Sequence, residues 1–172
     1  MLENRDYSEN QSNLHFNDNY HKLKLNENQI KFIDNNKCLS ECLNEILNSK
    51  HKNKTGHIFV GIDTEWKPSM VSGLNDLECK RASLIQISTH EKAYLIDMSI
   101  LYNSLDLNDK QDFVKNFILN KNIIKIGYGF SEDIKKISHS FNVNDHDHDH
   151  FRQSVLDLEY LIGQVTLKNY FS

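Results

Sequence analysis

The sequence has 172 residues, of which 38% are apolar and 26% charged, and its formal net charge is -4. This length provides one domain with a core of its own and leaves little room for two. No stretch approaches the roughly 20 apolar residues of a membrane span. The negative charge gives no support for nucleic-acid binding, although divalent ions held by carboxylates would reverse the local sign.

Residues 1–28 are rich in Asn, Asp, Glu and His and contain few apolar anchors. Such a segment buries too little apolar surface to fold, so we expect a disordered leader followed by a folded domain at 29–172. The leader lacks the basic start and apolar centre of a signal peptide, and its acidic residues argue against a transit peptide. We therefore expect a cytoplasmic or nuclear protein.

Three cysteines, Cys38, Cys42 and Cys79, favour a reducing compartment over a disulfide framework. Cys38 and Cys42 lie four residues apart on one side of an expected helix. A metal site there would need a second Cys or His pair at a matching spacing, which the sequence lacks. Small core residues are the simpler interpretation.

Strand and helix patterns alternate along the domain. In chain order we expect a strand at 29–33, a helix from 39 to about 50, a strand at 57–66, a loop at 69–80, a hairpin of strands 82–88 and 92–98, a helix through 113–118 capped by Asn108 or Asp109, an apolar strand at 123–127, a helix capped by Ser131, a strand at 154–158 and a helix from 160. Three consecutive strands followed by helix–strand–helix favour a mixed sheet covered by helices, an α/β domain.

The strand at 57–66 contains the strongest local conflict in the sequence. Asp63 and Glu65 lie two residues apart, so both carboxylates project from the same face, together with Gly61. Two anions this close repel each other unless a cation lies between them. One interpretation is a metal site, and the other is a strand that ends at Ile62 and leaves both acids solvated.

A second acid follows the apolar strand at 123–127. The glycine-bracketed turn Gly127-Tyr128-Gly129 leads into a helix whose first turn contains Asp133. The helix dipole favours an acid at this place, so Asp133 by itself is explained as an N-terminal helix residue.

Four strings of residues are more specific together than either acidic feature alone. They are Gly61-Ile62-Asp63-Thr64-Glu65-Trp66-Lys67-Pro68, Ala82-Ser83-Leu84-Ile85-Gln86-Ile87, Tyr94-Leu95-Ile96-Asp97-Met98 and Gly127-Tyr128-Gly129-Phe130-Ser131-Glu132-Asp133. In order and spacing they resemble the 3′–5′ exonuclease domain of the DEDD group, closest to its Nibbler-like branch, which is related to ribonuclease D and the Werner-syndrome exonuclease domain. The resemblance covers residue 29 to the C-terminus.

The resemblance implies a ribonuclease-H-like fold and a pair of Mg²⁺ or Mn²⁺ ions acting on the 3′ end of a single-stranded nucleic acid, RNA rather than DNA. By similarity, Asp63 would bridge both metals, Glu65 would bind the metal that activates water, and Asp133 would act on the leaving-group side. Two such ions about 4 Å apart stabilise the attacking and leaving oxygens of a phosphodiester. Trp66 and Tyr128 would either stack on the terminal base or pack in the core.

One part of the family pattern is missing. The family has a fourth acid that follows a Tyr or a His by four residues, whereas Asp157, the nearest candidate, follows Gln153 at that spacing and comes too soon after Asp133. We therefore expect a chain truncated before this motif. The alternative function is a non-catalytic nucleic-acid-binding or adaptor protein on the same fold.

The run Asp145-His146-Asp147-His148-Asp149-His150 has two interpretations. It offers ligands for loose binding of Zn²⁺ or Ni²⁺. Because the alternation lacks apolar support and falls between an expected helix and an expected strand, we favour an exposed surface loop.

Overall fold

The computed structural model describes residues 26–49, 54–68 and 76–170. A six-stranded sheet with the order β1-β4-β3-β2-β5-β6 organises the domain. Its strands are β1 (Ile30–Ile33), β2 (Ile58–Glu65), β3 (Leu84–Ser88), β4 (Ala93–Asp97), β5 (Ile123–Gly127) and β6 (Val155–Asp157). Only β3 runs against its neighbours, so the sheet is mixed, as predicted.

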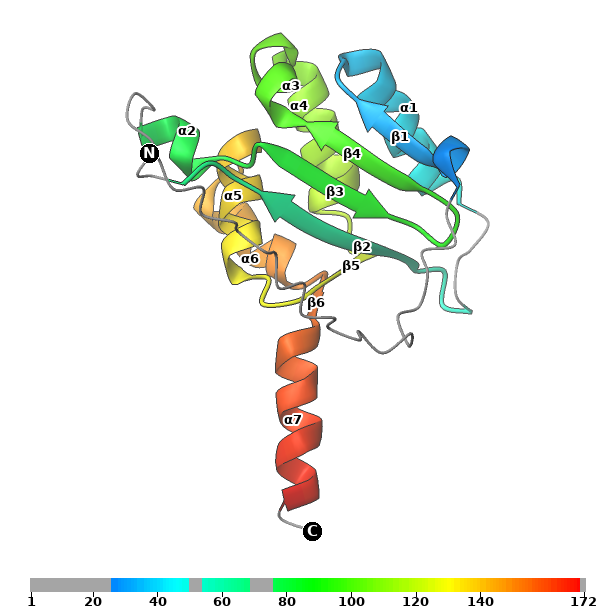
Figure 1. Cartoon of the computed structure of the whole chain (residues 1–172), viewed down its shortest axis with the longest axis vertical. Helices are drawn as coiled ribbons and strands as arrows, with labels where there is room; N and C mark the ends of the chain where they lie inside the picture. The colour runs from blue at the N-terminus through cyan, green and yellow to red at the C-terminus, as the bar shows by residue number, and fades with distance from the viewer. Residues whose placement is uncertain (1–25, 50–53, 69–75, 171–172) are drawn as a thin grey trace, which may run out of the picture.

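The helices lie mainly behind the sheet in the view of Figure 1, and α7 extends away from the body. They are α1 (Asn36–Leu47), α2 (Asp76–Lys80), α3 (Met98–Ser104), α4 (Leu107–Phe113), α5 (Ser131–Phe141), α6 (Asp145–Arg152) and α7 (Leu158–Tyr170), with a 3-10 turn, η1 (Glu27–Gln29), and a π-helical turn, η2 (Val114–Ile118). None of the helices in the described part of the chain is long and apolar enough to cross a membrane. Residues 1–25 of the expected leader at 1–28 lie outside the described residues.

The core lies between the sheet and these helices. On β2, the side chains of Ile58, Val60 and Ile62 are buried, while Phe59 on the other face is 43% exposed. Behind the sheet, the ring of Phe113 stacks on Phe117 and Phe141 with centroid distances of 5.0 and 4.7 Å. This aromatic cluster joins α4 and η2 to α5, and thereby fixes the helix layer against the sheet.

Glu45 attaches α1 to the sheet edge. Its carboxylate accepts hydrogen bonds from Lys31 on β1, from Lys92 beside β4 and from the hydroxyl of Tyr94. Burial acts to raise the pKa of Glu45, but these three donors outweigh it and lower the pKa to about 2. Cys42, one turn earlier on α1, is buried with its pKa raised to about 12 by desolvation, as expected for an inert core residue.

Five local features differ from the expectations. Residues expected as loops form α2 at 76–80 and α6 at 145–152, and α3 at 98–104 was not foreseen. The helix through 113–118 begins at 107, capped by Asp106 rather than Asn108 or Asp109. The N-cap of α5 is Phe130, without a side-chain bond, and Ser131 is its first residue.

The tertiary structure explains the helix α6. Asn144 caps it by accepting a hydrogen bond from the backbone N–H of Asp147 at 2.9 Å. Phe151 near its end is fully buried and meets the ring of Phe130 edge-on at 6.5 Å. An apolar anchor just beyond the alternating run therefore supplies the support that the run itself lacks.

The apolar strand β5 has a charged residue at its centre. Lys125 is fully buried, and its Nζ donates to the carbonyls of Ile118 and Asn120 and to Ser154 Oγ, at 2.8, 3.1 and 2.9 Å. Desolvation lowers the pKa of Lys125 to about 7. The three bonds tie η2, the turn after it and the start of β6 to one side chain.

We predict that Lys125→Ala lowers the free energy of unfolding by about 3 kcal/mol, because it leaves a cavity and three acceptors without a donor. Urea unfolding followed by circular dichroism measures the change. Lys121→Ala, at an exposed lysine in the preceding turn, is the matched control and should have little effect. Equal stability of the two variants would contradict this role for Lys125.

Candidate active site

Asp63 and Glu65 lie on the face of β2 that the helices leave uncovered. Both are exposed, whereas Ile62, which precedes Asp63, and Thr64, which lies between the two acids, are buried. The strand does not end at Ile62, because Asp63 and Glu65 are still paired with Gln86 and Leu84 of β3. The expectation of a strand that ends at Ile62 is therefore wrong, although both acids are exposed, and the sheet holds the two carboxylates in register.

A hollow of about 440 Å³ on the sheet adjoins Asp63. Its lining includes Gly61, Gln86, Ser88 and Tyr128. A Cβ atom at Gly61 would come within 2.4 Å of Ser88 Oγ, so glycine at this position leaves room for the hydroxyl of the neighbouring strand. The hollow provides space on the same face as the carboxylates.

Asp133 reaches the same strand from α5. The residue is only 6% exposed, and its Oδ1 accepts hydrogen bonds from Thr64 N at 3.0 Å and from Thr64 Oγ1 at 2.6 Å. Burial, supplemented by the negative charge of Asp63, raises the pKa of Asp133 against the opposing effect of the Thr64 bonds. Asp133 is therefore bonded to the residue that stands between Asp63 and Glu65.

Thr64 is a residue of the candidate site that the sequence did not point to. It faces the core side of β2, where a hydroxyl needs a hydrogen-bond partner to be buried at low cost. A polar residue at an inward position of an otherwise apolar strand was the available signal. The partner itself is 69 residues away in the sequence, and no local pattern identifies it.

The three acids differ in solvent exposure and in hydrogen bonding. Within the described residues, no group of three or more His, Cys, Asp and Glu side chains is arranged to hold a metal ion. Asp63 and Glu65 share one exposed face, while Asp133 is buried with Oδ1 engaged by Thr64. Mg²⁺ takes hard oxygen ligands and often binds only one or two protein carboxylates, completing its coordination with water and substrate phosphate. The donor set of Asp63 and Glu65 fits such an ion.

Asp157 stabilises the turn before α5. Its Oδ1 accepts from the backbone N–H groups of Gly129 and Glu159, both at 3.0 Å, and its Oδ2 from Phe130 N at 2.9 Å. Burial acts to raise the pKa of Asp157, but these backbone donors outweigh it and hold the pKa below its usual value. The carboxylate thus joins the Gly129 turn to the start of α7.

The two glycines of this turn have separate roles. Gly129 has φ +61°, a left-handed conformation that a side chain rarely adopts. Gly127 is covered by the ring of Phe130, which a Cβ atom would meet at 2.4 Å. The turn leaves Tyr128 exposed while Phe130 is buried at the start of α5.

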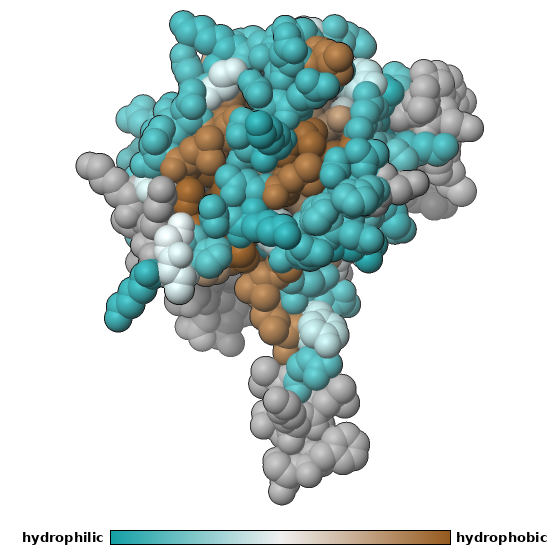
Figure 2. All heavy atoms as spheres, turned by 180° about the vertical axis from the view of Figure 1, so that it is seen from behind, coloured by the Kyte–Doolittle hydropathy of each residue, from teal (hydrophilic) through white to brown (hydrophobic). Residues whose placement is uncertain are grey.

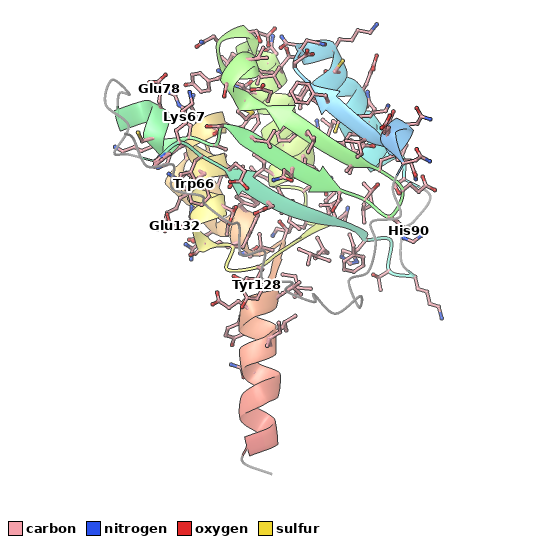
Figure 3. The ribbon with its side chains drawn as sticks, in the orientation of Figure 1. Trp66, Lys67, Glu78, His90, Tyr128 and Glu132 are labelled. Carbon is pink, nitrogen blue, oxygen red and sulfur yellow. The ribbon has the colours of Figure 1, made fainter. Side chains whose placement is uncertain are left out.

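Trp66 and Tyr128 do not pack in the core, because they are 40% and 67% exposed. Figure 3 shows Trp66 just beyond the end of β2 and Tyr128 near the start of α7. The Nζ of Lys136 lies 4.9 Å from the centroid of the Trp66 ring, a cation–π contact. Stacking of either ring on a base stays a prediction.

The comparison with known families identifies the domain. Residues 30–164 match the family model described as 3′-5′ exonuclease. The chain belongs to this family.

Two solved structures share the fold of this exonuclease-family chain. The EXO domain of Aedes aegypti Nibbler superposes with a TM-score of 0.63 at 24% identity, covering 86% of this chain and 61% of that one. The catalytic core of RRP6 from Trypanosoma brucei superposes with a TM-score of 0.50 at 16% identity, covering 77% and 30%. The chain therefore spans less than two thirds of either structure. No curated protein matches it. The predicted ribonuclease-H-like fold is confirmed.

We predict that Thr64→Val raises the pKa of Asp133 further, because it removes the short hydrogen bond that favours the ionised carboxylate. Titration of the carboxyl carbon by carbon-13 NMR measures the change. Thr64→Ser keeps the hydroxyl and should leave the pKa near that of the original protein. An unchanged pKa in the valine variant would show that the hydroxyl has no influence on Asp133.

Asp157→Ala should lower the free energy of unfolding at neutral pH by about 1 kcal/mol, the usual cost of losing a helix cap. Because the folded pKa of Asp157 is lowered, its contribution is complete above the ordinary aspartate pKa and is lost as the pH falls through the folded pKa. The gap between the original protein and the variant should therefore shrink on acidification. Urea unfolding over a pH series checks this, with Asp112→Ala, at an exposed aspartate on α4, as the control.

Proposed function

We propose that this chain is a metal-dependent 3′–5′ exonuclease domain that removes nucleotides one at a time from the 3′ end of a single-stranded nucleic acid, RNA rather than DNA. The observation that carries the proposal is the exposed pair Asp63 and Glu65 on one face of β2, with Asp133 hydrogen-bonded to the intervening Thr64. Family membership supports the reaction type.

The proposed roles follow from how each side chain is held. Asp63 and Glu65 would hold Mg²⁺ or Mn²⁺, and Asp133 would join them on the leaving-group side. When bound, two such ions stabilise the attacking and leaving oxygens of a phosphodiester. Thr64 keeps the Asp133 carboxylate in one orientation, so the reacting strand would meet a carboxylate that needs little reorganisation.

The sheet hollow and the exposed rings would receive the 3′ end. The hollow beside Asp63 offers Gln86 and Ser88 as hydrogen-bonding groups. Trp66 and Tyr128 present aromatic faces on which terminal bases would stack, a contact that tolerates any base. The preference for RNA rests on the strings around Asp63 and Asp133 that resemble the Nibbler-like branch. We place the activity in the cytoplasm or the nucleus.

A non-catalytic nucleic-acid-binding or adaptor role is the second candidate. Two observations favour it. No three-ligand metal group exists among the described residues, and the residue four positions before Asp157 is Gln153 rather than Tyr or His. Retention of Asp63, Glu65 and Asp133 favours the enzyme, since an adaptor has no need of a costly group of acids.

The two candidate functions predict different results when labelled RNA is incubated with the protein. We expect 5′-labelled single-stranded RNA incubated with the protein and Mn²⁺ to yield a ladder that shortens from the 3′ end. Asp63→Asn should reduce the rate by more than about 100-fold, beyond the loss typical of residues that only support a metal ligand. Asp112→Asn, an exposed aspartate on α4, should leave the rate unchanged, and EDTA should stop the reaction.

Intact RNA in every reaction would contradict the enzyme. An RNA band of reduced mobility in a gel-shift assay under the same conditions would then support the adaptor role. A parallel reaction with DNA of the same sequence tests the preference for RNA, which requires faster shortening of the RNA.

A further inference from the structure

A polar groove lies beyond the carboxyl end of β2, apart from the sheet hollow. Its volume is about 320 Å³, and its lining includes Lys67, Glu78, Arg81, Ser83 and Ser99. The backbone N–H of Ser83 donates to the carbonyl oxygen of Glu65 at 2.7 Å. The wall of the groove is therefore hydrogen-bonded directly to the strand residue that carries the second carboxylate of the candidate active site.

The residues that follow the active-site strand also form part of the groove wall. Lys67 follows Glu65 by two residues and lines the groove. Figure 3 shows Trp66, Lys67 and Glu78 at the same end of the molecule, where β2 ends and α2 lies. A strand bound at the carboxylates would therefore have this groove within its immediate surroundings.

Arg81 is oriented by an aromatic ring rather than by an acid. Its guanidinium carbon lies 3.5 Å from the centroid of the Tyr102 ring on α3. In the described part of the chain, the guanidinium forms no hydrogen bond and no ion pair. Stacking fixes the plane of the group while its N–H donors stay available at the edge, which suits bidentate binding of an oxyanion.

The groove has more positive than negative charge. Lys67 also lines the groove and has no ion-pair partner among the described residues. Glu78 is the acid in the lining. By contrast, Lys31 on β1 and Lys92 beside β4 are both paired with Glu45. In a chain of net charge -4, unpaired cations gathered in a polar groove indicate an anionic ligand.

We propose that this groove, defined by Arg81, Lys67 and Tyr102, binds a phosphate group of the nucleic acid. The phosphate belongs either to the bound strand or to the released mononucleotide, which share this chemistry. Arg81 is the main donor, Tyr102 holds its plane, and Lys67 adds charge. The inference rests on the proposed function, because the active site brings the nucleic acid to this edge of the sheet.

The test measures binding without cleavage. The affinity for a fluorescent 12-nucleotide single-stranded RNA is determined in EDTA at several salt concentrations. Arg81→Ala should weaken binding about tenfold, the loss of a charge-assisted contact. The slope of log affinity against log salt should become shallower by about 0.7, the value for one phosphate contact on a single strand.

Two further variants distinguish an effect of the Arg81 charge on binding from an effect on the folded structure. Arg81→Lys keeps the charge but loses the planar fork, so it should restore the salt slope and only part of the affinity. Arg152→Ala, at an exposed arginine on α6, is the matched control and should change neither quantity. Weaker binding by Arg81→Ala with an unchanged salt slope would mean that Arg81 acts through the fold, and would overturn the proposal.

Competition by a nucleoside 5′-monophosphate identifies the source of the phosphate. If Arg81→Ala weakens RNA binding but not nucleotide binding, the groove takes a phosphate of the strand. If it weakens nucleotide binding, the groove takes the product. Unchanged binding of both overturns the proposal. This assay is independent of cleavage, so a missing RNA ladder with an intact Arg81 effect would contradict only the proposed exonuclease activity.

Discussion

The hydrogen bonds between Thr64 and Asp133 are the contact on which the candidate site depends. They attach the first turn of α5 to β2 through both the backbone N–H and the hydroxyl of one residue. Because side chains alternate along a strand, a Thr64 that faces the core forces Asp63 and Glu65 to face outward. One residue thus sets the direction of two acids and the orientation of the third.

The turn before α5 shows how the rest of the chain supports this contact. Asp157 from β6 accepts three backbone N–H bonds from Gly129, Phe130 and Glu159. Phe130 then packs against Phe151 of α6, which fixes the start of α5 from behind. Lys125, two residues before this turn, ties β5 to Ser154 at the start of β6. Lys125, Ser154 and Asp157 therefore all have hydrogen-bond partners in this region, which lowers the free-energy cost of burying their polar groups.

The two faces of the sheet differ in exposure. The helix-covered face is buried and mainly apolar, apart from Thr64 and Lys125. The opposite face carries the two acids, Gln86 and Ser88 together with the exposed ring of Phe59. Figure 2, which shows the molecule from behind, is largely hydrophilic, with hydrophobic areas on the body and another where α7 leaves it. Leu158, Leu161 and Ile162 of α7 are 38, 39 and 57% exposed.

The sequence by itself determined the strands, the shared face of Asp63 and Glu65, and the family, because these depend on alternation and spacing within single elements. Only the tertiary structure decided that Asp133 bonds Thr64, that Asp157 stabilises a turn instead of joining the acids, and that Arg81 stacks on Tyr102. Each of those contacts joins elements far apart in the chain, and their meeting depends on the order of the strands and the packing of the helices. The helix α6 was missed for the same reason, since its stability comes from the burial of Phe151 against a distant ring and not from the alternating run of Asp and His.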